Sequence, residues 1–196
     1  DDFSKKKNIA ILSENKSYKK NPLLSSTYYL KKSLNSKHII TLGTLDQIIK
    51  PHNSVIIMPG KYTIPDEFEF KLNNWIREGG TLIRFSAKEL TNAKSKFLTK
   101  DSVPSIRYHG GELNIDKKVF ISPFSKKSIF NGLNIPDDIN ISKQLIFNSN
   151  SNKLNMLAKL DDNTPLVSIK SLEKGNIILF HISANNAWSD LPLSSL

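Results

Sequence analysis

The sequence predicts an α/β fold, in which a mostly parallel, doubly wound sheet has helices on both faces. Three observations support this prediction. A helix, a glycine pair and a strand follow one another over residues 72–86, short apolar runs recur without alternation, and the elements follow in the order β-α-β-β-α-β. Apolar runs of this kind are typical of strands that are covered on both faces. The 196 residues are therefore expected to form a single domain around one sheet.

The stretch over residues 72–86 predicts the end of a helix followed directly by a buried strand. Pro65 suits the first helical turn. The apolar residues that recur at helical spacing are Phe68, Leu72, Trp75 and Ile76. Gly79 and Gly80 can take the positive φ that ends a helix, and residues 81–85 then form a β-rich run. The stretch therefore predicts one crossover unit of a parallel sheet.

Four further strands and one further helix complete the predicted domain. The strands are expected at residues 8–12, 38–42, 54–58 and 177–182. The helix is expected at residues 22–34, with Asn21 as its N-cap. Between about residues 100 and 170 the pattern predicts a small antiparallel β insertion, because residues 139–147 alternate between apolar and polar side chains.

The composition excludes several kinds of site. The chain contains no cysteine, which removes disulfides, thiolate nucleophiles and sulfur-ligated metal sites. Its 28 Lys and Arg residues against 18 Asp and Glu residues give a net charge of +10, but the lysines are spread along the chain. Scattered lysines are usual on a solvated surface. Nucleic acid is therefore not the expected partner, and a basic polyanion-binding module is kept as an alternative.

The chain reads as a domain of a longer protein. It contains no run of about 18 apolar residues, so no membrane-spanning helix is predicted within it. Its start lacks both Met and the apolar core of a signal peptide, and its end lies in a segment that reads as structured. We therefore expect that further segments of the protein lie outside this chain.

Polar side chains at the ends of the predicted parallel strands mark the candidate site. In an open α/β sheet, ligands bind outside the carboxyl ends of the strands, near the point where the strand order reverses. The candidate pocket consists of Gly60, Ser86, His181, Ser183, Asn185, Trp188 and Asp190, of which Gly60, Ser86, Ser183 and Asn185 follow this rule. The histidines are scattered and no phosphate-binding glycine loop is present, so neither a metal nor a cofactor is expected.

Two questions about these residues stay open at the level of sequence. Ser86 or Ser183 could pair with His181 as a nucleophile and base, with Asp190 orienting the imidazole, which would make a cysteine-independent hydrolase. A histidine among apolar residues is more often a core residue with a satisfied hydrogen bond. Trp188 could line a pocket, but the favoured interpretation is that Trp188 covers the core while Asp190 caps a following helix.

Three segments together resemble one protein family: residues 72–86, 134–144 and 163–193. They carry the motifs Trp-Ile-x-x-Gly-Gly-x-Leu, Asn-Ile-Pro-Asp-Asp-Ile-Asn-Ile-Ser-Lys-Gln and Trp-Ser-Asp-Leu-Pro-Leu. The chain is similar to the extramembrane middle region of large bacterial membrane proteins. These proteins have an N-terminal double-transmembrane domain related to aerotolerance (Bat) proteins and a C-terminal domain called DUF4159.

The resemblance implies a fold, a location and a broad function. The implied fold is the class I glutamine amidotransferase-like fold, a flavodoxin-like sheet, and the implied location is the bacterial inner membrane with a soluble periplasmic domain. Active amidotransferases of this class use a cysteine nucleophile, and this chain has none. We therefore expect a non-catalytic domain for ligand sensing or protein interaction, with a small ligand or other envelope proteins as partners. No family residue with a defined role can be carried over.

Overall fold

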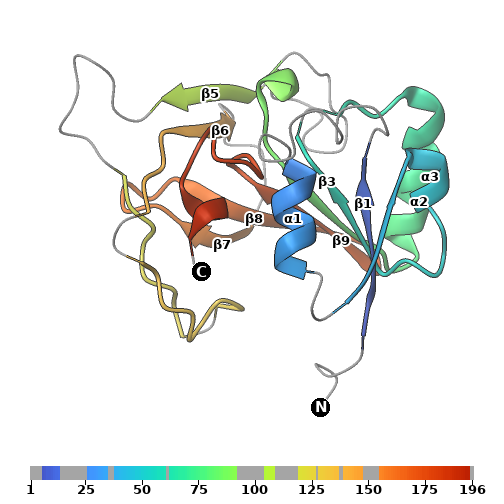
Figure 1. The fold of residues 1–196 in the computed structure, drawn as a ribbon, viewed down its shortest axis with the longest axis horizontal. Helices are drawn as coiled ribbons and strands as arrows, with labels where there is room; N and C mark the ends of the chain where they lie inside the picture. Colours follow the sequence, from blue (N-terminus) through green and yellow to red (C-terminus); the bar gives the residue numbers. More distant parts are fainter. Residues whose placement is uncertain are drawn as a thin grey trace.

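The computed structural model describes residues 6–13, 26–34, 38–60, 62–91, 104–108, 119–126, 128–136, 139–147 and 155–194. These residues form a seven-stranded sheet with helices on both faces and a separate pair of strands (Figure 1). The predicted α/β class, with a mostly parallel central sheet, is confirmed. No helix among the described residues is long and apolar enough to cross a membrane.

Five parallel strands form the main part of the sheet. They are β1 (Asn8–Leu12), β2 (Ile39–Gly43), β3 (Val55–Met58), β4 (Thr81–Phe85) and β9 (Gly175–Phe180). Two antiparallel strands, β7 (Asn155–Lys159) and β8 (Pro165–Leu172), extend it. The strand order is β2-β1-β3-β4-β9-β8-β7, so β4 is the central strand. The ends of the five parallel strands differ from the predicted ends by at most two residues.

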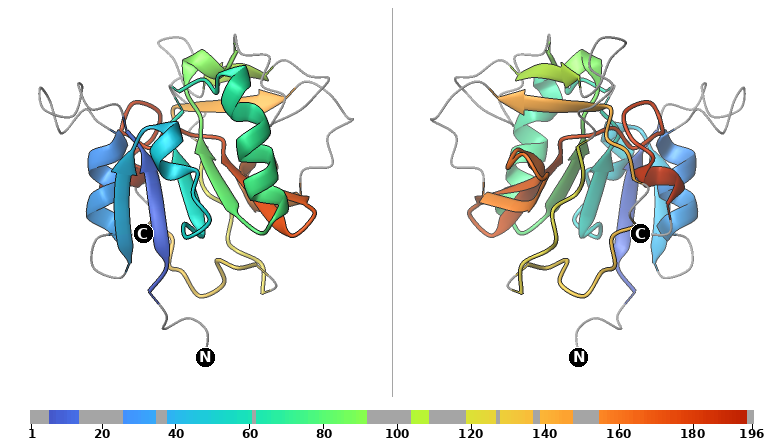
Figure 2. Two further views of the ribbon diagram at one scale, coloured as in Figure 1. Left: turned by 90° about the vertical axis from the view of Figure 1, so that its right-hand side faces the viewer. Right: turned by 90° about the vertical axis from the view of Figure 1, so that its left-hand side faces the viewer.

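Helices cover both faces of the sheet. α1 (Ser26–Leu34) lies on one side, and α2 (Leu45–Ile48) and α3 (Asp66–Arg77) lie on the other (Figure 2). Two short 3₁₀ helices follow the sheet strands: η3 (Lys88–Thr91) after β4, and η4 (Leu191–Leu193) near the end of the described chain. The predicted N-cap of the first helix, Asn21, lies outside the described residues.

The junction between α3 and β4 follows the prediction closely. Pro65 occupies the N-cap position of α3, one residue before the first helical turn. Gly79 has a φ of +119°, a conformation that ends the helix and that other residues rarely adopt. A Cβ atom on Gly80 would lie 2.5 Å from the ring of Trp75, so only glycine lets the strand start directly against this buried indole. The indole Nε1 donates to the Asn53 carbonyl oxygen at 3.3 Å.

Each face of the sheet has its own apolar cluster, because alternate residues of a strand point to opposite faces. On the side of α2 and α3, Leu72 packs into a cluster that includes Leu82 of β4. On the side of α1, Leu30 packs against a cluster that also contacts Ile83 of β4. A further apolar cluster lies over β7, β8 and β9, where residues of the 119–141 segment pack against Val167.

The predicted β insertion is divided between two sheets. β5 (Pro104–Tyr108) and β6 (Lys143–Phe147) pair antiparallel and apart from the central sheet. β7 and β8 instead join the central sheet, where β8 pairs with the outer edge of β9. This pairing covers an edge that would otherwise present unpaired N–H and C=O groups. The two sheets are connected by the Leu145 amide, which donates to the His181 carbonyl oxygen at 2.7 Å.

Candidate functional site

The structure brings Gly60 and Ser86 together at the carboxyl ends of β3 and β4. A Cβ atom on Gly60 would lie 2.3 Å from the carbonyl carbon of Ser86, so the two backbones are in direct contact. The Ser86 hydroxyl donates to the Phe180 carbonyl oxygen at 2.7 Å, and its amide donates to the Ile182 carbonyl oxygen at 2.9 Å. Ser86 is 1% exposed, and its hydroxyl thus joins the end of β4 to the end of β9.

His181 is a fully buried residue with both ring nitrogens hydrogen bonded. Nδ1 lies 2.6 Å from the Leu145 carbonyl oxygen, and Nε2 lies 2.8 Å from the Ser168 hydroxyl. A carbonyl oxygen only accepts hydrogen bonds, so Nδ1 carries the proton and Nε2 accepts from Ser168. Desolvation by burial lowers the pKa of His181 to about 4, against the opposing effect of the Leu145 hydrogen bond. The imidazole is therefore neutral at neutral pH.

The serine bonded to His181 is Ser168, in place of the predicted Ser86 or Ser183. The Ser183 hydroxyl faces the carbonyl oxygen and side-chain oxygen of Asn185, each at 2.9 Å. Ser168 and His181 are both buried, and both ring nitrogens of His181 are already hydrogen bonded within the core, so neither is left to activate a nucleophile. The predicted serine and histidine arrangement is thus corrected: His181 is a core residue that joins β6, β8 and the end of β9. The reason is that the Leu145 carbonyl and Ser168 approach it from neighbouring strands.

Trp188 covers the core, and Asp190 lies at the surface behind it. Trp188 is 6% exposed and packs in a cluster with Leu90, Leu145 and Leu179. Asp190 is exposed and occupies the N-cap position of η4, but its side chain makes no capping hydrogen bond. Trp188 therefore covers the core, as the favoured interpretation of the sequence predicted. The predicted side-chain cap by Asp190 is not formed.

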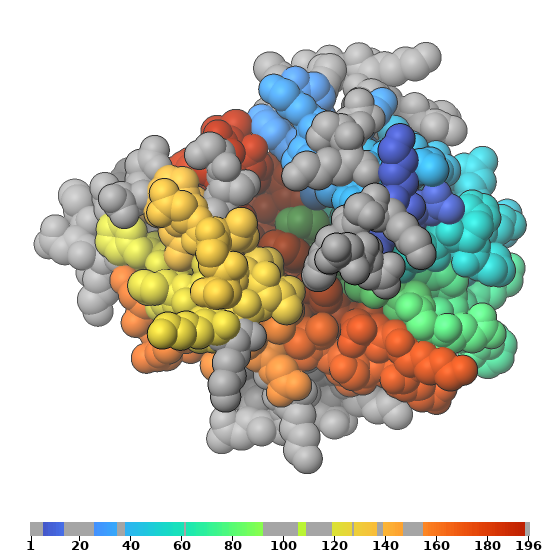
Figure 3. Space-filling model, turned by 90° about the horizontal axis from the view of Figure 1, so that it is seen from below, coloured from blue at the N-terminus to red at the C-terminus, as the bar shows by residue number. Residues whose placement is uncertain are grey.

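A mostly apolar cavity of about 360 Å³ opens on the α1 face of the sheet, beside the ends of β4 and β9. The space-filling view in Figure 3 shows this hollow between the blue α1 region and the yellow 119–136 segment. Its floor includes Phe85 and Phe180, whose rings stack with centroids 4.5 Å apart. Its walls come from α1, from the 119–136 segment and from η4. Ser183 is the predicted site residue that lines it.

The lining of this cavity determines what it can hold. Among the described residues that line it, the hydroxyl-bearing ones are Tyr29, Ser33, Ser183 and Ser194, and none is acidic, basic or a histidine. Ligand cavities in proteins are commonly of this kind, apolar with a few polar groups that fix orientation. An apolar cavity of about 150 Å³ is large enough for benzene. The cavity therefore suits an uncharged molecule with an apolar body of up to about two small rings.

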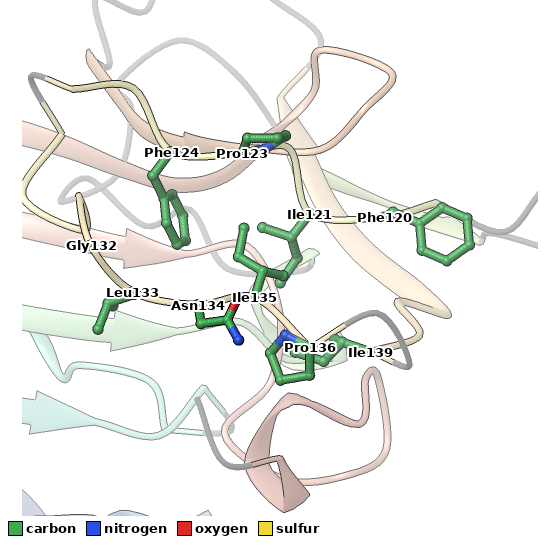
Figure 4. Close-up of a pocket in the computed structure, with 10 residues that line it drawn as sticks. All are labelled: Phe120, Ile121, Pro123, Phe124, Gly132, Leu133, Asn134, Ile135, Pro136 and Ile139. Carbon is green, nitrogen blue, oxygen red and sulfur yellow. The ribbon is translucent and has the colours of Figure 1, made fainter.

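A second hollow, of about 540 Å³, lies within the 119–139 segment. Figure 4 shows its lining residues on two stretches of chain, 120–124 and 132–139, with Phe124 pointing toward the second stretch and Phe120 pointing away. Phe124 and Leu133 line both this hollow and the cavity on the α1 face. The 119–136 segment is therefore a wall shared by the two hollows.

Sequence reasoning missed most of the residues that form the cavity. Phe85 and Phe180 lie at or near the carboxyl ends of predicted strands, which is a signal that could have selected them, whereas their pairing in register is seen only in the structure. Tyr29 and Phe124 carry no such signal, because they reach the cavity from separate covering segments. Among the described residues, no group of three or more His, Asp or Glu side chains could hold a metal ion.

No protein-family model and no curated protein matches the chain. Solved structures with a similar fold include a β-galactosidase from Rahnella sp. R3, with a TM-score of 0.61 and 11% identity over 90% of this chain and 28% of that chain. The chain spans 27–28% of the length of this and two other β-galactosidases.

Two further solved structures match over nearly their whole length. A cytoplasmic protein from Salmonella typhimurium LT2 has a TM-score of 0.59 and 14% identity, over 93% of this chain and 90% of that chain. The N-terminal domain of mmIFT52 has a TM-score of 0.58 and 12% identity, over 92% of this chain and 89% of that chain. At such identities the likeness shows the fold alone, and the fold it shows is an α/β sheet domain.

Proposed function

We propose that this chain is a non-catalytic ligand-binding domain with a flavodoxin-like, class I glutamine amidotransferase-like fold. The strand order supports the fold proposal, because the parallel strands β2-β1-β3-β4-β9 follow the 2-1-3-4-5 order of flavodoxin-like sheets. The sequence resemblance to the amidotransferase-like region points the same way. The absence of cysteine from the chain argues against the chemistry of active amidotransferases.

The observation that carries the proposal is the apolar cavity on the α1 face. It lies beside the carboxyl ends of β4 and β9, which is the edge where open α/β sheets bind ligands. The described residues of its lining offer hydroxyl groups for orientation, and none of them is an acid, a base or a histidine that could transfer a proton. The Ser183 hydroxyl directs its hydrogen to Asn185, so its lone pairs can accept a hydrogen bond from a ligand. The proposed ligand is an uncharged molecule with an apolar body and a hydrogen-bond donor.

Calorimetric titration with 1-naphthol, indole and 1-octanol tests the proposal. At least one of these neutral molecules is expected to bind, whereas octylamine is expected to bind more weakly, because burying its ammonium group is costly. Ser33 lies on the exposed side of α1 and lines the cavity, so Ser33→Trp should fill the cavity and weaken binding at least about tenfold. Lys32→Trp adds the same ring to the same helix at a residue outside the lining and should leave binding unchanged.

Two results would overturn the ligand proposal. One is that none of the neutral molecules binds to the wild-type protein. The other is that Ser33→Trp binds them as tightly as the wild-type protein does, which would move the binding site elsewhere. In either case, protein interaction would become the leading function, and the search would turn to envelope proteins as partners.

We also propose that the domain belongs to a bacterial inner-membrane protein and faces the periplasm. This proposal rests on the sequence resemblance of residues 72–86, 134–144 and 163–193. The full-length protein is expected in the inner-membrane fraction, with this domain cleaved by protease added to spheroplasts. Recovery of the full-length protein in the soluble cytoplasmic fraction would overturn the proposal.

A further inference from the structure

Arg84 is a buried cation on the face of the sheet opposite the apolar cavity. Along β4, Leu82 faces the cluster on the α3 side, whereas Ile83 and Phe85 face the α1 side. Because strand residues alternate, Arg84 points to the α3 side with Leu82. Arg84 is 1% exposed and is among the largest fully buried side chains of the domain. It lies one residue from the carboxyl end of the central strand, in register with Met58 and Leu179 on the neighbouring strands.

The guanidinium of Arg84 makes a single hydrogen bond among the described residues. Nη2 donates to the Tyr62 carbonyl oxygen at 2.7 Å, and Nε and Nη1 have no hydrogen-bond partner there. A guanidinium has five N–H donors in one plane. Nη2 has two hydrogens, one on the edge that it shares with Nη1 and one on the edge that it shares with Nε. The Tyr62 carbonyl accepts one of them, so the other edge keeps two parallel N–H groups without a partner. Such an edge matches the two oxygens of a carboxylate.

An unpaired buried charge is costly to the fold, and this cost is the reason for assigning Arg84 a role. The ion pairs found among the described residues are Arg77 with Glu173 and Arg107 with Asp162, and neither involves Arg84. Burial lowers the pKa of Arg84 to about 10, which still leaves the side chain positively charged at neutral pH. A buried cation without a counter-ion destabilises a protein more than an apolar residue of similar size would. Arg84 is thus poorly explained as a packing residue.

We propose that Arg84 is the anchor of a second ligand site, on the α3 face of the sheet, which binds a carboxylate through two parallel N–H groups. A carboxylate is planar and carries one negative charge, which matches one guanidinium in an enclosed position. A phosphate dianion carries two negative charges. Among the described residues, Arg84 provides one positive charge at this position, so the second negative charge would be buried without a partner. The position near the carboxyl ends of β3, β4 and β9 is where open α/β sheets bind ligands.

Thermal unfolding at constant ionic strength tests this site with formate, acetate, hexanoate, phosphate and chloride as sodium salts. At least one carboxylate is expected to raise the unfolding midpoint of the wild-type protein by several degrees above its value in chloride, and phosphate is expected to raise it less. A larger effect of formate and acetate would identify a free small anion. A larger effect of hexanoate would identify the carboxylate group of a larger molecule. Both of these results support the proposal.

Variants separate a specific site from a general effect of salt. Arg84→Met removes the guanidinium and keeps the length of the side chain, and it should abolish the difference between carboxylate and chloride. Arg77→Met makes the same change of charge at an exposed arginine and should retain the difference. Arg84→Lys keeps the charge but loses the two-donor edge, so its carboxylate response should be smaller than that of the wild type.

The proposal is also testable if Arg84→Met does not fold. Acetate should shift the Nε–H resonance of Arg84 in the ¹H–¹⁵N NMR spectrum of the wild-type protein, and chloride should not.

The proposal is overturned if no carboxylate exceeds chloride in its effect on the wild type, if Arg84→Met retains the full response, or if phosphate acts as strongly as the carboxylates. The apolar cavity lies on the other face, so Ser33→Trp should keep the carboxylate response, and the two proposals can fail separately.

Discussion

A single histidine connects strands of both sheets in this domain. The His181 ring bonds to the Leu145 carbonyl of β6 and to the Ser168 hydroxyl of β8, and its amide donates to the Leu166 carbonyl oxygen at 2.9 Å. All of these contacts are buried, where an unsatisfied polar group is costly. The neutral imidazole therefore acts as a structural link, with one donor and one acceptor that are both used.

The buried imidazole makes the stability of the domain depend on pH. Below pH 6.5, the His181 ring of the unfolded chain takes up a proton, whereas the folded ring does so only near its pKa of about 4. Its contribution is therefore complete above pH 6.5 and is lost as the pH falls toward 4. From pH 6.5 to pH 5, we expect a loss of about 2 kcal/mol in the free energy of unfolding from this residue.

Urea unfolding at pH 6.5 and pH 5 measures this contribution. Other groups also titrate in this range, so the informative quantity is the difference between the wild type and His181→Gln, whose amide does not titrate. His52→Gln replaces an exposed histidine and should retain the pH dependence of the wild type. An equal loss of stability in the wild type and in His181→Gln would contradict the buried, neutral state of His181.

At the scale of elements, the α3–β4 junction shows how two adjacent glycines serve different purposes. Gly79 needs its positive φ, and a Cβ atom on it would meet nothing within 4 Å. Gly80 instead gives space to the Trp75 ring, which would lie 2.5 Å from a Cβ atom. We expect Gly80→Ala to lower the free energy of unfolding by about 1–3 kcal/mol through overpacking. Gly79→Asn should also lower the free energy of unfolding, but through backbone strain, because a φ of +119° lies outside the left-handed region that asparagine tolerates.

Urea unfolding and near-ultraviolet circular dichroism distinguish these two effects. Gly80→Ala should change the aromatic spectrum as well as stability, because the Trp75 ring must shift to admit the methyl group. Gly79→Asn should leave the aromatic spectrum unchanged. If Gly80→Ala left both the spectrum and the stability unchanged, the close packing of the indole against the strand would be wrong.

The elements that the sequence predicted well are those whose burial is fixed locally. The strand at residues 81–85 follows a glycine pair and is buried on both faces, so its class and its limits could be predicted. β7 and β8 could be recognised as strands, but their pairing with the central sheet could not. Alternation tells which side of a strand is buried, whereas the choice of partner depends on which edge remains open after the rest has folded.

At the scale of the whole molecule, the predicted edge of the sheet lies close to both proposed sites, but the residues that form them were not identified. The rule of carboxyl strand ends selected Ser86 and Ser183, which lie near the apolar cavity, and overlooked Arg84. A cavity is the space that packing leaves between segments far apart in sequence, as with Tyr29 and Phe124. Likewise, the unpaired charge of Arg84 depends on which side chains the fold places around it. Neither property can be obtained from one segment of sequence.

The net charge of +10 is a property of the whole molecule, and the fold indicates how it acts. Lys32 is exposed on α1 and Lys71 is exposed on α3, and these two helices lie on opposite faces of the sheet (Figure 2). A duplex can contact one such face at a time, and the number of phosphates neutralised should be small. We therefore expect weak binding to DNA, with a shallow dependence on salt, since the slope of log K against log salt follows the number of neutralised phosphates.

Fluorescence anisotropy with a labelled duplex between 50 and 200 mM NaCl measures this dependence. Lys32→Glu and Lys71→Glu make the same change of charge on opposite faces, and each should weaken the binding slightly and to a similar extent. A slope that corresponds to about six or more neutralised phosphates would instead favour the polyanion-binding alternative. Abolition of binding by one of the two variants alone would then locate that function on one face. If the positive charge is spread over both faces, neither the steep salt dependence nor the loss of binding in a single variant is expected. Strong binding requires positive charges that are concentrated on one surface.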